Sequence, residues 1–321
     1  MLHISILIPE TAVMASVADP RYMFTAINGF MEQTGKPPLF IVQLIGTKRA
    51  MTLSDGLFTI HTDALLQEIT HTDLVILPAL SGDMQTALEL NKELLPWIID
   101  KYEKGAELAS LCIGAFLLAA TGLLKGKKCS THWLFATEFR NKFPEVILVD
   151  DKIITEENRL YSSGGANSYW NLLLYLVEKY TSREIAIMAS KYFVIETMRN
   201  NQSPFVIFTG QKSHKDETVI QAQNYIEKNY AQRITVDQLA TIMATGKRTL
   251  ERRFKDATGN TITEYMQRVK VEAAKKSFEI TRDNITEVMY AVGYTDPKAF
   301  RTTFKKITGV SPVVYKNKYS R

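Results

Sequence analysis

The stretch Arg248-Thr-Leu-Glu-Arg-Arg-Phe-Lys-Asp-Ala-Thr-Gly259 decides how the last third of the chain folds, because it is written twice. Fifty positions later it returns as Lys298-Ala-Phe-Arg-Thr-Thr-Phe-Lys-Lys-Ile-Thr-Gly309. In each copy, the residues at i, i+3, i+4 and i+7 are polar and mostly basic, whereas the opposite stripe is aliphatic or aromatic. That period belongs to an α-helix. The repeat therefore predicts two short helices, each with one face for packing and one face for a polar partner.

A shorter predicted helix and a tight turn precede each repeated helix. Thr235 and Gln238 have the spacing of a capping box at the first of these short helices. Asp296 is a good N-cap for the second repeated helix, and Pro297 suits its first position. Each half is therefore a predicted helix-turn-helix, and the amphipathic segment 264–278 would join the two halves rigidly.

This arrangement resembles the DNA-binding domain of the AraC/XylS family of bacterial transcription regulators over residues 219–321, most closely from Gly293 to Tyr315. The resemblance implies that the second helix of each unit enters the major groove of promoter DNA, with the units roughly 34 Å apart. Lys and Arg would attract phosphates, Arg would bridge guanine, and Glu would accept from cytosine. The residues expected to contact DNA are Lys247, Arg248, Glu251, Arg252, Lys255, Pro297, Lys298, Arg301, Thr302 and Lys305.

Three residues depart from the usual family pattern. Gly246 stands where a serine usually caps the first repeated helix, Thr302 replaces a common arginine, and Met289 replaces a common small residue. Thr302 should weaken the contact of the second helix with phosphate or base. We therefore expect sequence preference to depend more on Arg248, Glu251 and Arg252.

The charge of the chain is unevenly distributed. Residues 219–321 hold 19 Lys and Arg against 10 Asp and Glu, whereas residues 1–218 hold 20 against 24. A basic tail on an acidic body indicates a polyanionic partner for the tail alone. A solvated surface with a bias toward Lys and Arg would have the same composition, so charge by itself leaves both interpretations open.

The first two thirds of the chain alternate short apolar runs with helical stretches. Uniformly apolar runs between helices are typical of parallel strands buried on both faces. This pattern predicts a flavodoxin-like, doubly wound, mostly parallel α/β sheet, followed by the all-α domain with two helix-turn-helix units. The segment 146–161 is predicted to be a polar strand pair that turns at 156–158. The predicted buried strands are 3–8, 40–45, 74–77 and 107–111, and the predicted helices between them are 19–34, 91–104 and 113–123.

Cys112 lies between an apolar strand and a helix, and Gly114 follows two residues later, as in a nucleophile elbow. His132 follows twenty residues on, and cysteine with histidine is the minimum for nucleophilic catalysis. The pattern resembles the PfpI-like branch of the class I glutamine amidotransferase-like superfamily over residues 3–195, and with the tail it resembles the GlxA-type regulators. Ser16 stands where enzymatic relatives carry an acidic residue, and Pro78-Ala-Leu-Ser-Gly82 lacks the usual glycine pair.

These departures argue against catalysis. Cys112 is interpreted as a ligand-pocket or vestigial residue, with a redox sensor and a working nucleophile as alternatives. His132 is expected to be a hydrogen-bonded pocket residue. No cofactor and no metal site are expected, since the remaining histidines lack metal-ligand spacing. The candidate ligand pocket comprises Ser16, Cys112, Ile113, His132, Gly164 and Asn167.

The sequence divides into a predicted sensor or dimerisation domain (1–198), a linker (199–218) and a DNA-binding domain (219–321). The expected function is sequence-specific transcription regulation, in which the first domain binds a small effector or mediates dimerisation. The alternative is an enzyme: a cysteine-dependent amidohydrolase, a peptidase or a glyoxalase-like protein that carries a DNA-binding domain. We expect no enzyme activity, a homodimer, a cytoplasmic location and no membrane partner, with RNA polymerase as a further candidate partner.

Overall fold

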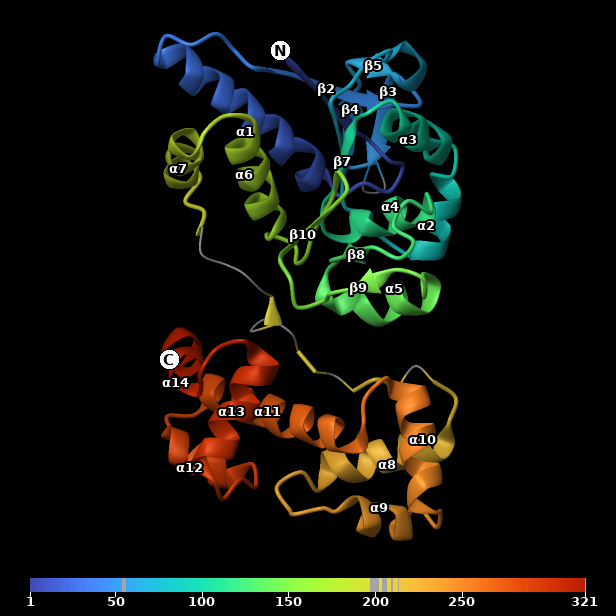
Figure 1. Ribbon diagram of the computed structural model, residues 1–321, viewed down its shortest axis with the longest axis vertical. Coiled ribbons are helices and arrows are strands. Elements are labelled where there is room, and N and C mark those ends of the chain that lie inside the picture. Colours follow the sequence, from blue (N-terminus) through green and yellow to red (C-terminus); the bar gives the residue numbers. More distant parts are fainter. Residues whose placement is uncertain (54–55, 197–201, 204–206, 209, 213, 321) are drawn as a thin grey trace. The chain divides into compact units, whose positions relative to one another are not determined.

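The computed structural model describes residues 1–321 except 54–55, 197–201, 204–206, 209, 213 and 321. The chain forms two compact units, Met1–Gln202 and Ser203–Arg321, and each is considered by itself (Figure 1). The division falls inside the predicted linker. Among the described residues of the predicted linker, Gln202 therefore belongs to the first unit, and the residues from Ser203 onward belong to the second.

A seven-stranded sheet with strand order β10-β11-β7-β6-β1-β2-β5 forms the centre of the N-terminal unit. Every neighbouring pair is parallel except β10 with β11. The predicted doubly wound, mostly parallel sheet is thus confirmed. In chain order the strands are β1 (Leu2–Leu7), β2 (Phe40–Gly46), β5 (Ala64–Leu65), β6 (Leu74–Leu77), β7 (Glu107–Ser110), β10 (Ile154–Glu157) and β11 (Leu160–Ser163).

Two separate hydrophobic cores lie on the two faces of this sheet, because successive residues of a strand point to opposite faces. Leu74 and Ile76 of β6 belong to the core beneath α1, α6 and α7, whereas Val75 and Leu77 belong to the other core. Figure 1 shows these two groups of helices on opposite sides of the sheet. The helices are α1 (Met14–Gln33), α6 (Tyr169–Tyr180) and α7 (Arg183–Tyr192), and on the other face α2 (Met84–Leu90), α3 (Leu94–Glu103), α4 (Ala115–Ala120) and α5 (Ala136–Lys142).

The polar strand pair predicted at 146–161 has different bounds in the structure. The antiparallel hairpin is β10 with β11, and it turns at Asn158 and Arg159, whose φ angles of 50° and 64° are left-handed. The earlier part of the segment, β9 (Ile147–Leu148), pairs instead with β8 (Lys128–Cys129). Other small elements are the β3 (Ala50–Leu53) and β4 (Phe58–His61) hairpin and three 3-10 turns, η1 (Leu66–Glu68), η2 (Cys112–Gly114) and η3 (Trp133–Phe135).

The C-terminal unit is helical and has two cores joined by one long helix. One core gathers α8, α9, α10 and the start of α11, and the other gathers the end of α11 with α12, α13 and α14. Tyr230 packs against both cores. The helices are α8 (Glu217–Lys228), α9 (Val236–Ile242), α10 (Lys247–Thr258), α11 (Ile262–Ile280), α12 (Ile285–Ala291), α13 (Pro297–Thr308) and α14 (Pro312–Tyr319). Across the described part of the chain, no helix combines the length and the apolar character needed to cross a membrane.

Candidate functional site

The repeated stretches form α10 and α13, two helices of equal length with the same kind of ending. Each stops at a glycine in the left-handed conformation, Gly259 at φ 70° and Gly309 at φ 77°. Their beginnings differ. Asp296 accepts a hydrogen bond from the Lys298 N–H at 2.8 Å, and Pro297 occupies the first turn, whereas Gly246 provides no side-chain cap for α10.

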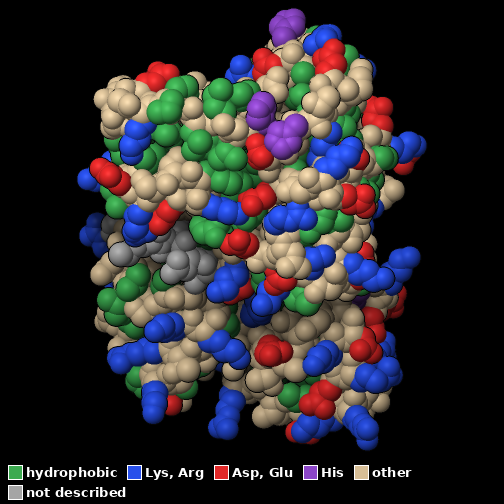
Figure 2. All heavy atoms as spheres, turned by 45° about the horizontal axis from the view of Figure 1, so that its top comes forward, with side chains coloured by type: hydrophobic (Ala, Val, Ile, Leu, Met, Phe, Trp, Pro, Cys, Tyr) green, Lys and Arg blue, Asp and Glu red, His purple; other side chains and the backbone are tan. Residues whose placement is uncertain are grey.

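One face of each helix is buried and the other is open. Leu250 and Phe254 of α10, and Phe300 and Phe304 of α13, are at most 1% exposed and fill the two cores. The polar stripes lie outside these cores, and Figure 2 shows Lys and Arg side chains projecting from the C-terminal unit. The predicted contact residues are all exposed: Lys247, Arg248, Glu251, Arg252, Lys255, Pro297, Lys298, Arg301, Thr302 and Lys305.

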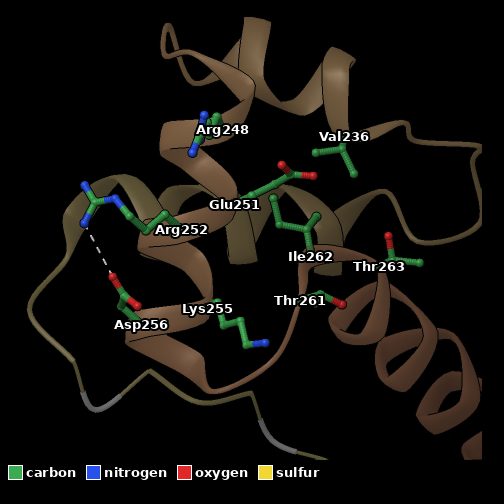
Figure 3. Close-up of a pocket in the computed structure, with 9 residues that line it drawn as sticks. All are labelled: Val236, Arg248, Glu251, Arg252, Lys255, Asp256, Thr261, Ile262 and Thr263. Carbon is green, nitrogen blue, oxygen red and sulfur yellow. Dashed lines mark ion pairs between the residues drawn. The ribbon is translucent and has the colours of Figure 1, made fainter.

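A cavity of about 340 Å³ opens beside the exposed face of α10. Figure 3 shows Glu251 and Lys255 on the α10 side and Thr261 and Ile262 at the start of α11. Arg252 makes an exposed ion pair with Asp256 at 3.5 Å, whereas Arg248 makes no ion pair among the described residues. The cavity is lined by Val236, Arg248, Glu251, Arg252, Lys255, Asp256, Thr261, Ile262 and Thr263. This wall can offer three cations and two carboxylates, Glu251 and Asp256, to a polar ligand.

An ion pair that sequence reasoning missed holds α10 to the start of α8. Arg253 donates from Nε to one carboxylate oxygen of Asp216 at 2.8 Å and from Nη2 to the other at 2.6 Å. Asp216 also caps α8 by accepting from the Val219 N–H at 3.1 Å. The Arg253 guanidinium is the main reason that the pKa of Asp216 lies below its usual range. Arg253 lies between the two stripes of α10, a position that gave no signal of its role.

Described residues of the predicted linker pack on the C-terminal unit. Phe208 meets the ring of Tyr265 edge to face, and its N–H donates to Glu272 at 3.1 Å. Glu272 in turn accepts from the buried Lys275 ammonium at 2.9 Å. Gln211 accepts from the Asn260 amide at 2.6 Å through its side chain. These contacts extend the C-terminal unit toward the N-terminus, beyond the predicted boundary at residue 219.

The two helix-turn-helix units are fixed to one another by close backbone contacts. A Cβ atom added at Gly293 would lie 2.2 Å from the Ala231 carbonyl oxygen, in the loop after α8. The Lys270 ammonium of α11 donates to the Gly293 carbonyl at 3.1 Å and covers the ring of Tyr294. Contacts this close allow little independent movement, so α10 and α13 are presented on one rigid body.

In the N-terminal unit, Cys112 lies at a strained turn between β7 and α4. Its φ angle is 53°, and it is only 4% exposed. A Cβ atom at Gly114 would lie 2.4 Å from the Leu77 carbonyl oxygen and 2.5 Å from that of Pro78. Glycine is therefore required at position 114 by the close approach of the neighbouring strand end, and this is the elbow geometry expected from the sequence.

The elbow thiol lacks the partners of an activated nucleophile. Burial raises the pKa of Cys112 to about 12, despite a hydrogen bond from the Ile113 backbone. Burial also lowers the pKa of His132, whose Nδ1 accepts from the Leu134 N–H at 3.1 Å. No hydrogen bond joins Cys112 to His132 in the described part of the structure. Both groups are consequently neutral near pH 7.

The Ser16 side chain is hydrogen-bonded to the backbone amide of Ala79, which follows β6. Its hydroxyl accepts from the Ala79 N–H at 2.9 Å and donates to the Val13 carbonyl at 2.7 Å. The neighbouring carboxylate of Asp19 points elsewhere and accepts from the Tyr169 hydroxyl at 2.6 Å. An amide that could bind an oxyanion is thus already used by the protein itself.

The turn at 163–165 meets the elbow through Ser163. Ser163 accepts from the Cys112 N–H at 3.1 Å, and the Thr131 hydroxyl donates to the Cys112 carbonyl at 3.2 Å. Gly164 is buried beside them, whereas Asn167 is exposed. Ile113 is half-buried. Thr131 was not among the predicted pocket residues, because only the fold brings these three distant segments together.

Comparisons with known proteins agree with the division into two units. Residues 31–179 match the DJ-1/PfpI family, and residues 239–318 match a helix-turn-helix domain. The chain joins a DJ-1/PfpI domain to an AraC-type helix-turn-helix domain. The resemblance predicted from the sequence is thereby confirmed.

Curated relatives match most of the chain. The chain is 26% identical over 268 residues to the HTH-type transcriptional regulator GbdR of Pseudomonas aeruginosa, which covers 82% of this chain and 71% of that protein. Among solved structures, a protein from Vibrio parahaemolyticus described as a transcriptional regulator matches 60% of this chain and 98% of its own, with a TM-score of 0.53 and 22% identity. A ThiJ/PfpI family protein from Pseudomonas syringae matches 84% of this chain and 88% of its own, with a TM-score of 0.51 and 13% identity. The two structures bear on the fold alone.

Proposed function

We propose that the protein is a sequence-specific, DNA-binding transcription regulator of the cytoplasm, and that its DJ-1/PfpI domain binds a small effector or mediates homodimerisation. The observation that carries the proposal is the pair of matching helices, α10 and α13, which bury their apolar faces and expose polar, basic faces on one rigid unit. The similarity to named transcriptional regulators supports it. RNA polymerase is a candidate partner for a regulator of this kind.

The exposed faces suit the two tasks of DNA recognition. Lys247, Lys255, Lys298 and Lys305 would attract phosphates, which position the protein but carry no sequence information. Arg248 and Arg252 can bridge guanine, and Glu251 can accept from cytosine. Two such helices on one rigid unit can address successive major-groove faces, so that one chain can recognise an asymmetric site.

Fluorescence anisotropy of the full-length protein on labelled duplexes tests the proposal. Binding should weaken as salt rises, with the logarithm of the affinity falling by roughly 0.9 per phosphate contact for each decade of salt. Sites selected from a random duplex library should share a common sequence. Absence of salt-dependent binding to any duplex would overturn the proposal.

The competing function is a cysteine-dependent enzyme. A buried thiol whose pKa is about 12 is almost entirely protonated at pH 7 and is a poor nucleophile. We therefore expect no turnover of amides or 2-oxoaldehydes, and labelling of Cys112 by iodoacetamide at pH 8 should be far slower in the native protein than in urea. Turnover that Cys112→Ala abolishes would establish the enzyme instead.

A further inference from the structure

Gln202 places a fully satisfied carboxamide inside the N-terminal unit. The residue is 1% exposed. Its Nε2 donates to the carbonyl of Thr131 at 2.9 Å and to that of Asp150 at 2.8 Å, and its Oε1 accepts from the Gly165 N–H at 2.9 Å. Its backbone N–H donates to the Asp151 carbonyl at 2.8 Å. Both donor hydrogens and the acceptor of the amide are therefore matched by fixed backbone groups.

The space around this carboxamide is shaped for it. A Cβ atom at Gly164 would lie 2.5 Å from Nε2, 2.7 Å from Cδ and 2.8 Å from Oε1 of Gln202. Gly164 does not have a positive φ angle. Glycine is thus needed at this position to admit the amide group, and not to satisfy a backbone conformation.

Two segments that contact Gln202 also contact Cys112 at the elbow. Thr131 contacts Gln202 through its carbonyl and contacts Cys112 through its hydroxyl. The turn at 163–165 likewise receives the Cys112 N–H at Ser163 and donates to Gln202 from Gly165. Gln202 consequently fills a chamber that shares two walls with the pocket predicted for an effector.

We propose that this chamber is a carboxamide-binding subsite, that Gln202 is its tethered occupant, and that an effector with a primary carboxamide displaces it. Backbone carbonyls at Thr131 and Asp150 demand N–H donors, and the Gly165 N–H demands an acceptor. A carboxylate lacks the donors, and an ammonium group leaves the Gly165 N–H without an acceptor. The chemistry of the walls therefore selects a primary amide.

This inference rests on the proposed function, because the effect of displacing Gln202 depends on the segment of chain to which it is joined. Gln202 is the last residue of the N-terminal unit, and Ser203 begins the unit that carries α10 and α13. Release of Gln202 would free the residue that directly precedes the helix-turn-helix unit in the chain. Occupancy of the subsite would in this way affect the DNA-binding unit through the segment of chain that joins the two units.

Chemical rescue of full-length Gln202→Ala tests the subsite. The substitution deletes the atoms of an acetamide molecule, so free acetamide should fill the vacated chamber. At ten times its Kd, acetamide should raise the folding equilibrium constant of Gln202→Ala about tenfold in thermal unfolding. It should also slow hydrogen exchange at the Gly165 amide. Acetate, which has the same shape but no N–H donor, should do neither.

The unsubstituted protein and Gln67→Ala serve as controls, because Gln67 is an exposed glutamine of the same unit. Neither should respond to acetamide in the same concentration range, since their chamber holds a tethered amide at high effective concentration. An equal response to acetamide in Gln202→Ala and Gln67→Ala, or an equal response to acetate, would overturn the proposal.

A second variant covers the case in which Gln202→Ala does not fold. Gln202→Met keeps the length of the side chain but can neither donate to Thr131 nor accept from Gly165, so hydrogen exchange at Gly165 should accelerate. Unchanged exchange would overturn the proposal. Duplex binding is measured separately on the same proteins. A chain that binds acetamide but no DNA would refute the transcription-regulator function and leave the subsite standing.

Discussion

The turns of the two helix-turn-helix units have the same backbone but different residues. After α9, the Thr245 N–H donates to the Ala240 carbonyl at 3.0 Å, and Ala244 has a φ angle of 49°. After α12, the Tyr294 N–H donates to the Met289 carbonyl at 3.0 Å, and Gly293 has a φ angle of 76°. Both turns close a helix in the same way.

The neighbours of these turns explain the difference. Ala244 is exposed, so the expected energetic cost of its methyl group is that of a left-handed backbone conformation alone. Gly293 lies against the Ala231 carbonyl, where a methyl group has no room. The second unit is therefore locked to the first at its turn, whereas the turn of the first unit faces solvent. The exposed faces of the two repeated helices also differ. At matched positions, α10 carries more charged residues than α13.

The largest expected effect comes from breaking that lock. Gly293→Ala adds a methyl group that clashes with backbone and has an unfavourable φ, so we expect a loss of about 3 kcal/mol in the free energy of unfolding. Urea denaturation measures it. Gly259→Ala is the matched control, because its φ is also positive but nothing lies within 4 Å of the added atom. Its cost should be about 1 kcal/mol. Equal costs would contradict the lock.

The next effect concerns the unequal recognition faces. Arg252→Ala should weaken DNA binding by about 1–3 kcal/mol, if Arg252 contacts a base, and relax sequence preference at one position. Thr302→Ala, at the equivalent position of α13, should change affinity far less. Thr302→Arg should strengthen binding and increase the salt dependence by about one phosphate contact. Anisotropy titrations at several salt concentrations distinguish these outcomes. Equal losses for the two alanine variants would show that the faces contribute alike.

A smaller effect is expected from the ion pair that only the first unit has. Thr303 stands in α13 where α10 has Arg253. The pKa of Asp216 is lowered in the folded state, chiefly by Arg253, so its stabilising contribution is present above the ordinary aspartate pKa of about 3.9 and is lost as pH falls through the lower folded value.

Arg253→Met should remove part of this acid dependence and cost up to about 1 kcal/mol near neutral pH, because the pair is partly exposed. Denaturation midpoints between pH 7 and pH 3 measure the difference. A variant whose stability falls with acid as steeply as that of the unsubstituted protein would show that Arg253 does not set the Asp216 titration.

The smallest expected effect is a gain. Ala244→Gly relieves the left-handed strain at the exposed turn but increases the freedom of the unfolded chain, so the net stabilisation should be about 0.5 kcal/mol. Differential scanning calorimetry of the two proteins measures it. Destabilisation by Ala244→Gly would mean that the alanine methyl makes a contact worth more than the strain.

Much of the fold could be predicted from periodicity alone. The repeat at 248–259 and 298–309 predicted α10 and α13. Its basic and its apolar residues separate onto two opposite faces when the segment is wound as an α-helix. The apolar runs at 3–8 and 74–77 predicted strands buried on both faces for the same kind of reason. The segment 146–161 was harder, since short polar strands lack a strong period, and part of it pairs with β8 instead of forming the hairpin.

The candidate sites show where sequence reasoning ends. Position within a helix was enough to predict that the ten candidate residues are exposed, and their contact with DNA stays a prediction. The pairing of Arg253 with Asp216, and the contacts of Thr131 with both Cys112 and Gln202, could not be predicted. These residues are far apart in the sequence, and no local pattern encodes contacts of that kind.

The amino-acid sequence by itself determined the two domain types, the parallel sheet, the paired helices and the sharp turn at Cys112, because each depends on local spacing and side-chain chemistry. Only the tertiary structure decided that the Cys112 thiol is buried and neutral, that Ser16 occupies the Ala79 amide, and that Gln202 closes the chamber beside the elbow. Burial and hydrogen bonding between distant segments arise when the chain packs, and they set the pKa and the accessibility of each group.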